Sequence, residues 1–288
     1  GNLNTAVGYA AGTAVTTGVR NTLIGGAAGD ALTTGSYNAS LGYDSLAVDT
    51  LGSRAVAIGY GALSTQNFTS ATDNYNVAVG FSAGNAVTTG TENTFIGGEA
   101  GKATTTGGNN TFVGTDAGDA NTTASNNTGI GRDSLTDNTT GENLTAVGEG
   151  SLANNTTADN NTAVGKNAGL SVTTGVQNTF VGSLAGDATD DGTNNVAVGF
   201  ESLSANCGSG NVSLGCRAGK ALTGDNNTLV GNQAGILLTS GDDNIAIGHN
   251  ALASEDTGTN ATAVGVGALG TQNYNGDTHN TAIGHNAL

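Results

Sequence analysis

A short string of alternating apolar residues returns along the whole chain. Each copy ends in glycine, as in Asn-Thr-Ala-Val-Gly at 4–8 and Asn-Thr-Leu-Ile-Gly at 21–25. The residue one before this glycine is always Val, Ile or Leu, and the residue three before it is Thr, Val, Ile or Ala. Alternation with period two over a short run predicts a β-strand with one buried face. We therefore expect a short strand before each glycine, with its aliphatic residue facing inward.

The glycines that end these strings are evenly spaced. Taken as anchors, they are Gly8, Gly25, Gly42, Gly59, Gly80, Gly97, Gly114, Gly131, Gly148, Gly165, Gly182, Gly199, Gly215, Gly231, Gly248, Gly265 and Gly284. Of the 16 spacings between them, 12 are 17 residues. A unit this short, with one strand, buries its apolar residues only by stacking on its neighbours. The spacing predicts an all-β solenoid, or β-roll, of about 17 coils that forms a single array over 1–288, with insertions at about 64–74 and 270–279.

Two other positions of the repeat fit a stack of coils. Four residues after the anchor stands either Leu, as at Leu46, or Gly, and the Gly copies often carry an aliphatic residue three positions later, as at Val87. We expect both to fill the same small core. Asn stands four before the anchor in 14 of 17 copies, and stacked Asn side chains can form hydrogen bonds along the axis.

The position two before each anchor is uncharged in every copy. By the alternation above it faces outward, and it includes large apolar residues: Leu23, Phe95, Phe112, Phe180 and Leu229. A row of such residues would exceed the apolar patches usual on monomers. We therefore expect this row to be the interface between chains of a homo-oligomer.

The core string Val-Ala-Ile-Gly-x-x-Ala at 56–62 resembles the head repeat of YadA-like trimeric autotransporter adhesins. Close variants stand at 77–83 and 245–251, and Asn-Thr-Ala-Ile-Gly strings with Thr-Thr-Gly turns look like repeats of bacteriophage tail-fibre-type proteins. The resemblance covers essentially the whole chain, although the adhesin repeat is nearer 14 residues. It implies a left-handed β-roll, three chains side by side, and attachment as the function.

Composition excludes several classes of partner. The net charge is −16, from 7 basic and 23 acidic residues, which disfavours nucleic acid and anionic membrane surfaces. No run of about 18 apolar residues exists, so we expect no membrane insertion. The three histidines, His249, His279 and His285, have no cysteine nearby, and the acidic pairs at 190–191 and 242–243 are typical of solvated turns. We expect no enzyme, no cofactor and no metal site.

The residues most suited to binding are aromatic. The position after the anchor reads Tyr43, Tyr60 and Phe81 in three consecutive copies, and Phe68 lies in the first insertion. Aromatic faces with neighbouring amides and hydroxyls can hold sugar rings, so these four residues form a candidate glycan contact. Aromatic residues that only stack on one another are the alternative.

Cys207 and Cys216 are the only cysteines. They permit one disulfide, whose geometry the sequence does not fix.

The sequence thus favours an extracellular, cell-surface or virion protein: a fibre or adhesin-like module that associates with itself and attaches to a surface glycan or host receptor. The alternatives are a structural filament that assembles end to end and an ice-binding solenoid.

Overall fold

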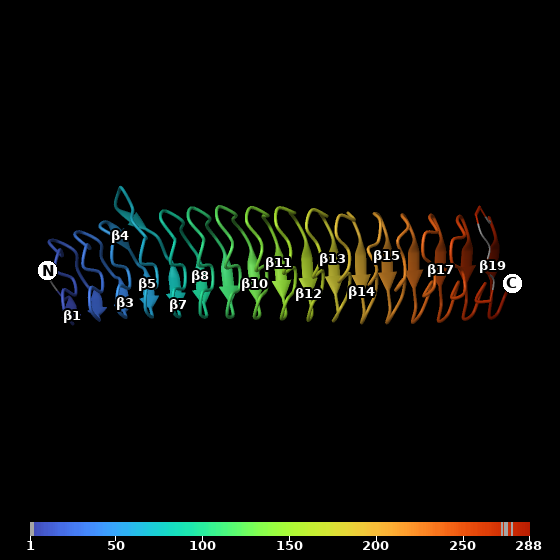
Figure 1. The fold of residues 1–288 in the computed structure, drawn as a ribbon, viewed down its shortest axis with the longest axis horizontal. Helices are drawn as coiled ribbons and strands as arrows, with labels where there is room; N and C mark the ends of the chain where they lie inside the picture. Colours follow the sequence, from blue (N-terminus) through green and yellow to red (C-terminus); the bar gives the residue numbers. More distant parts are fainter. Residues whose placement is uncertain (1–2, 272, 274–275, 278) are drawn as a thin grey trace. The chain divides into compact units, whose positions relative to one another are not determined.

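The computed structural model describes residues 3–271, 273, 276–277 and 279–288. This part of the chain contains strands and turns and no helix. The chain divides into two compact units, Gly1–Leu144 and Thr145–Leu288, and both are built from the same kind of coil. In each unit, strands from successive coils lie side by side (Figure 1).

The first unit contains one three-residue strand per coil and two shorter strands, the second of which lies in the first insertion. Their bounds are β1 (Thr5–Val7), β2 (Thr22–Ile24), β3 (Ala39–Leu41), β4 (Gly52–Ser53), β5 (Val56–Ile58), β6 (Thr72–Asp73), β7 (Val77–Val79), β8 (Thr94–Ile96), β9 (Thr111–Val113) and β10 (Thr128–Ile130). Parallel pairing joins β1, β2, β3, β5, β7, β8, β9 and β10 in that order, and equivalent residues pair, as in Phe95 with Phe112.

The second unit repeats this arrangement. Its strands are β11 (Thr145–Val147), β12 (Thr162–Val164), β13 (Thr179–Val181), β14 (Val196–Val198), β15 (Val212–Leu214), β16 (Thr228–Val230), β17 (Ile245–Ile247), β18 (Thr262–Val264) and β19 (Thr281–Ile283). Each pairs in parallel with the next. The prediction of a parallel β-solenoid with a repeat of about 17 residues is confirmed, whereas the three-chain arrangement stays a prediction.

The predicted orientation of the strands is wrong. In every three-residue strand after β1 the middle residue is buried in the coil, and the two outer residues are half-buried or exposed. All five predicted interface residues lie in the core: Leu23, Phe95, Phe112, Phe180 and Leu229 are each 0–1% exposed. Ile96, one before its anchor, is 40% exposed. The constant aliphatic residue therefore marks the outer face of the strand, and the variable position marks the core.

Large side chains fill the interior of the coils from three positions. Where the middle strand residue is Phe, as at Phe112, the residue four after the anchor is Gly118, and a Cβ there would lie 2.6 Å from the Phe112 ring. Where the middle residue is small, as at Ala57, Leu63 stands at that place and is fully buried. In other coils, such as that of Val87, the aliphatic residue comes three positions later. The compensation expected from the sequence is confirmed.

Asparagines tie each coil to the next. The Asn93 Oδ1 accepts the N–H of Asn110 at 3.0 Å, and the Asn93 Nδ2 donates to the Gly107 carbonyl at 2.9 Å. The same pair of bonds recurs at Asn21 and Asn178. Hydrogen bonding along the stack is therefore confirmed, with backbone groups as the main partners. These bonds satisfy buried polar groups that the small core leaves without water.

One copy that lacks the asparagine shows how the bond is replaced. Ala55 occupies the position, and the N–H of Asn76 in the next coil bonds instead to the Oδ1 of Asn74 at 2.9 Å. Asn74 belongs to the first insertion, where β4 and β6 pair and the loop projects from the coils near the β4 label (Figure 1). The second insertion, at about 270–279, lies partly outside the described residues.

The anchor glycines end the strands for a conformational reason. Gly97 has φ of 141°, a value that L-residues rarely adopt, and its Cβ would collide with the carbonyl oxygen of Gly114 in the next coil. Only glycine permits this close approach of stacked backbones. The turn it makes separates the strand face from the column of residues that follows each anchor.

Candidate interaction surfaces

The outer face of the strands carries two rows of side chains. The row one before the anchor is Val, Ile or Leu in every coil, and the row three before it is Thr, Val, Ile or Ala. Neither row contains a charge, although the chain carries −16. Ten members of the first row are more than a third exposed: Val7, Leu41, Ile58, Ile96, Ile130, Val164, Val198, Leu214, Ile247 and Ile283. The apolar surface that sequence reasoning expected does exist, one residue away from the row that was predicted.

The aromatic residues after the anchors form a stack in the first unit. The ring centroids of Tyr43 and Tyr60 are 5.8 Å apart, and those of Tyr60 and Phe81 are 5.4 Å apart, with an angle of 11° between the planes in both pairs. All three rings are exposed. Phe68 is not part of this surface, because it is only 5% exposed. Its prediction as a glycan contact is wrong, since the insertion folds this ring inward.

A hollow of about 370 Å³ lies beside the stack. It is lined by Asp44, Ala47, Val48, Tyr60, Gly61, Ser64, Thr65 and Asn85. The amide of Asn85 donates to the Ser64 hydroxyl at 2.7 Å and to the Gly61 carbonyl at 3.1 Å. The mixture of apolar and hydroxyl groups suits small polar molecules, at the lower end of the volumes usual for ligand sites.

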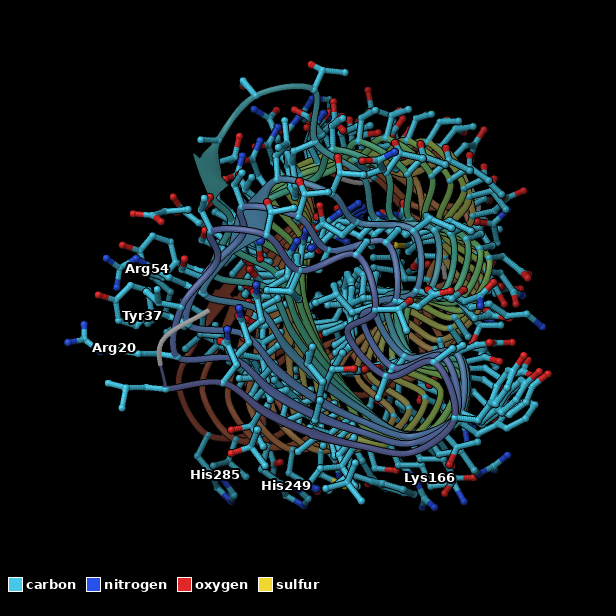
Figure 2. All side chains as sticks on the ribbon, turned by 90° about the vertical axis from the view of Figure 1, so that its left-hand side faces the viewer. Arg20, Tyr37, Arg54, Lys166, His249 and His285 are labelled. Atoms are coloured by element: carbon cyan, nitrogen blue, oxygen red, sulfur yellow. The ribbon has the colours of Figure 1, made fainter. Side chains whose placement is uncertain are left out.

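A second column in the first unit was missed from the sequence. Arg20, Tyr37 and Arg54 project together from one side of the coils (Figure 2). The guanidinium carbons of Arg20 and Arg54 lie 5.3 and 5.1 Å from the centroid of the Tyr37 ring. Arg54 also pairs with Asp73 of the first insertion at 2.9 Å. The signal was present, because the three column residues are spaced by 17. Cation–π contacts of this kind stabilise the stacking of exposed coils modestly.

Cation–carboxylate contacts also link coils in the second unit. The Glu201 carboxylate accepts from Arg217 at 2.9 Å and from Lys220 at 2.7 Å. Hydrogen bonds from Lys220 and then Arg217 hold the pKa of Glu201 below its usual value. Lys166, which points outward in Figure 2, lies 3.4 Å from Glu149 of the preceding coil. These pairs neutralise local charge between coils and form no enclosed site.

The two cysteines do not form a disulfide. Cys207 is buried and Cys216 is exposed, and both are free thiols. The Cys207 sulfur contacts the Thr189 hydroxyl of the preceding coil at 3.2 Å, and burial raises the pKa of its thiol. The disulfide that the sequence permits is absent, because Cys207 fills the interior of its coil, whereas Cys216 follows an anchor glycine on the outside.

Within the described residues, no group of three or more His, Cys, Asp or Glu side chains is arranged to hold a metal ion. The same residues include no helix that is long and apolar enough to cross a membrane.

Comparison with known proteins adds no assignment. No family model matches the chain, and no curated protein matches it either.

Proposed function

We propose that the chain is a structural attachment module of an extracellular fibre, whose copies associate side by side through the outer face of the strands. The observation that carries this proposal is the row of Val, Ile and Leu side chains, one in every coil, of which ten are more than a third exposed. An uninterrupted apolar row of this kind is typical of an interaction surface.

A second copy of the chain is the partner that fits this row best. The side chains recur once per coil, so a partner with the same repeat can meet each of them in register. Both rows of the face are uncharged, so two strongly acidic chains can approach there without repulsion between like charges at the contact. The resemblance to trimeric adhesin heads and phage tail-fibre repeats supports the same arrangement and is the source of the expected three-chain stoichiometry.

Burial of a single side chain of the row is too weak to drive association, so the whole row is needed. Full burial of an Ile or Val contributes about 1.5–3 kcal/mol, so covering a side chain that is 40% exposed, such as Ile96, contributes about 1 kcal/mol. Association costs about 4–15 kcal/mol of lost rotational and translational freedom. The eight members of the row in the first unit offset a cost of that size together.

Three aspartates on the face test the proposal. The variant Ile58→Asp/Ile96→Asp/Ile130→Asp places a charge in three coils of the row, and its desolvation should prevent association. We expect the oligomeric mass of the wild type to fall to that of a single chain by light scattering.

The matched control is Thr34→Asp/Thr106→Asp/Thr140→Asp, which adds the same charge at exposed turn positions of the same unit. It should keep the wild-type mass, and circular dichroism should be alike for all three proteins. An aspartate variant on the strand face that keeps its oligomeric mass would rule out this face as the interface.

The second candidate function is binding to ice. Thr occupies the first outward position of β8, β9 and β10 in the first unit and of β11, β12 and β13 in the second, beside Val or Ile. A regular array of hydroxyl and methyl groups can order water. Inhibition of ice recrystallisation at micromolar concentration by a protein of single-chain mass would favour this function over self-association.

A further inference from the structure

The aromatic stack of the first unit ends at a glycine. Tyr43, Tyr60 and Phe81 follow the anchors of three successive coils, whose strands β3, β5 and β7 are paired. Their rings are stacked from coil to coil, so one face of Phe81 lies on Tyr60. The other face of Phe81 points toward the next coil, where Gly98 occupies the corresponding position.

The space over Gly98 is open. A Cβ placed on this residue would meet no atom within 4 Å, and Phe81 is 56% exposed. Any residue can adopt the backbone conformation at this position, because the φ angle of Gly98 is not positive. In other coils the same position carries large side chains such as Arg132 and Phe200. Gly98 therefore leaves vacant the place that the next ring of the stack would take.

The vacant place has two different walls. Phe81 forms the apolar wall, and the exposed Thr115, one coil beyond Gly98, lies on the other side. Two coil steps of about 4.8 Å separate positions 81 and 115, which leaves room for one ring in van der Waals contact with both.

Two acidic residues adjoin the slot in the sequence. Glu99 and Asp116 directly follow Gly98 and Thr115, and Glu99 pairs with Lys102 at 2.8 Å. The backbone N–H groups of Glu99 and Asp116 donate to the carbonyls of Phe81 and Gly98, so these two residues can offer a ligand the acceptor oxygens of their carboxylates. Acceptors suit the hydroxyl groups of a sugar, and the negative surroundings disfavour anionic ligands.

We propose that the slot over Gly98 binds one ring of a neutral glycan, with the apolar C–H face of the sugar stacked on Phe81. Hydroxyl groups at the rim of the sugar donate to the carboxylates of Glu99 and Asp116, and another pairs with Thr115. A single exposed ring contact gives weak binding, and several copies on one fibre raise the avidity. This ligand class extends the attachment role but does not depend on how the chains assemble.

The slot can be filled by the protein itself. The substitution Gly98→Tyr extends the stack by one ring and is compatible with the backbone and with the open space at this residue. The matched control is Asn232→Tyr, which adds a ring at the equivalent exposed position of a coil in the second unit. Phe81→Ala removes the apolar wall.

The test uses saturation-transfer NMR with neutral oligosaccharides: maltohexaose, cellohexaose and N-acetylchitohexaose. We expect transfer to at least one of them with the wild type and with Asn232→Tyr, and a fall of about fivefold or more with Gly98→Tyr and with Phe81→Ala. Sialyllactose, the anionic probe, should show less transfer than the neutral sugars.

Absence of transfer to all three neutral sugars would overturn the proposal, as would a Gly98→Tyr variant that binds like the wild type. A lower oligomeric mass of Gly98→Tyr by light scattering would also overturn it, because the slot would then be occupied by a second copy. Light scattering on the wild type separates this result from failure of the proposed assembly.

Discussion

At the scale of single residues, the least expected feature is a buried carboxylate. Asp49 lies inside its coil, at a position where other coils have Leu32 and Val87. Its carboxylate accepts the N–H of Gly52 at 2.9 Å and the amide of Gln66 in the next coil at 2.7 Å. Burial raises the pKa of Asp49 more than these hydrogen bonds lower it. The residue is therefore held in the core at the expense of stability near neutral pH.

Replacing Asp49 by asparagine should reveal how much stability the buried carboxylate costs near neutral pH. Because the pKa of Asp49 is raised in the folded state, its contribution to stability is most favourable below the ordinary value of 3.8 and falls as pH rises above it. Asn138 has the corresponding position in another coil and accepts the N–H of Gly141 in the same way, so Asp49→Asn keeps the bond from the Gly52 N–H and loses the oxygen that accepts from Gln66. We expect urea unfolding to show the variant gaining stability relative to the wild type between pH 3.5 and pH 7.

The control is Asp191→Asn, which removes an exposed charge outside the core and should change the stability little. A stability difference for Asp49→Asn that is constant over the range, or that moves in favour of the wild type, would contradict the assignment.

At the scale of the coil, the core follows a rule of complementary size. Phe95, Phe112 and Phe180 each stand in the middle of a strand, and each of these coils has glycine four residues after its anchor. The coils with Leu at that place have Ala, Ser or Gly in the strand, and these leucines adopt φ values near 50°, as at Leu63 and Leu135. Leu and Gly are therefore both compatible with this backbone, and the neighbouring side chain decides between them.

Exchange of the two sizes within one coil tests the rule. Phe112→Ala should destabilise the protein by about 3–5 kcal/mol, because it leaves a cavity and removes the stacking on Phe95. Gly118→Leu alone should also destabilise, because its side chain would collide with the Phe112 ring. The double variant reproduces the coil of Ala57 and Leu63, and we expect it to be about 2 kcal/mol or more stable than Phe112→Ala in urea unfolding. A double variant no more stable than either single variant would show that the coils are not interchangeable.

Part of this fold can be predicted from the sequence. The 17-residue spacing, the glycines and the asparagines determine a stack of parallel coils, and these follow from periodicity alone. Periodicity does not show which face of each strand is buried, because a three-residue strand has too few positions to distinguish its two faces by hydrophobicity. The large Phe112 and the small Gly118 in one coil indicate that the middle strand residue is buried, since only residues in contact must compensate in size.

Features outside the repeat were harder to predict. Phe68 lies in an insertion with no equivalent in the other coils, so nothing in the sequence indicates that its ring turns inward. Cys207 lies where a shortened coil shifts the inward position by one residue. The column of Arg20, Tyr37 and Arg54, in contrast, could have been found by aligning the copies.

At the scale of the whole molecule, no segment among the described residues covers the outer strand face. The rows of Val, Ile and Leu are exposed in both units, and the chain avoids charge on this face although it is strongly acidic elsewhere. Selection for solubility of a monomer would place polar residues on such a surface. We infer that further copies of the chain cover the outer strand face.

The most direct test of this account is the molar mass of the unmodified chain in solution by sedimentation equilibrium. Self-association through the strand face predicts an integral multiple of 27.8 kDa that persists on dilution to about 1 µM, and the resemblance to trimeric adhesins predicts a multiple of three. A mass of 27.8 kDa at every concentration up to about 50 µM would contradict the central claim.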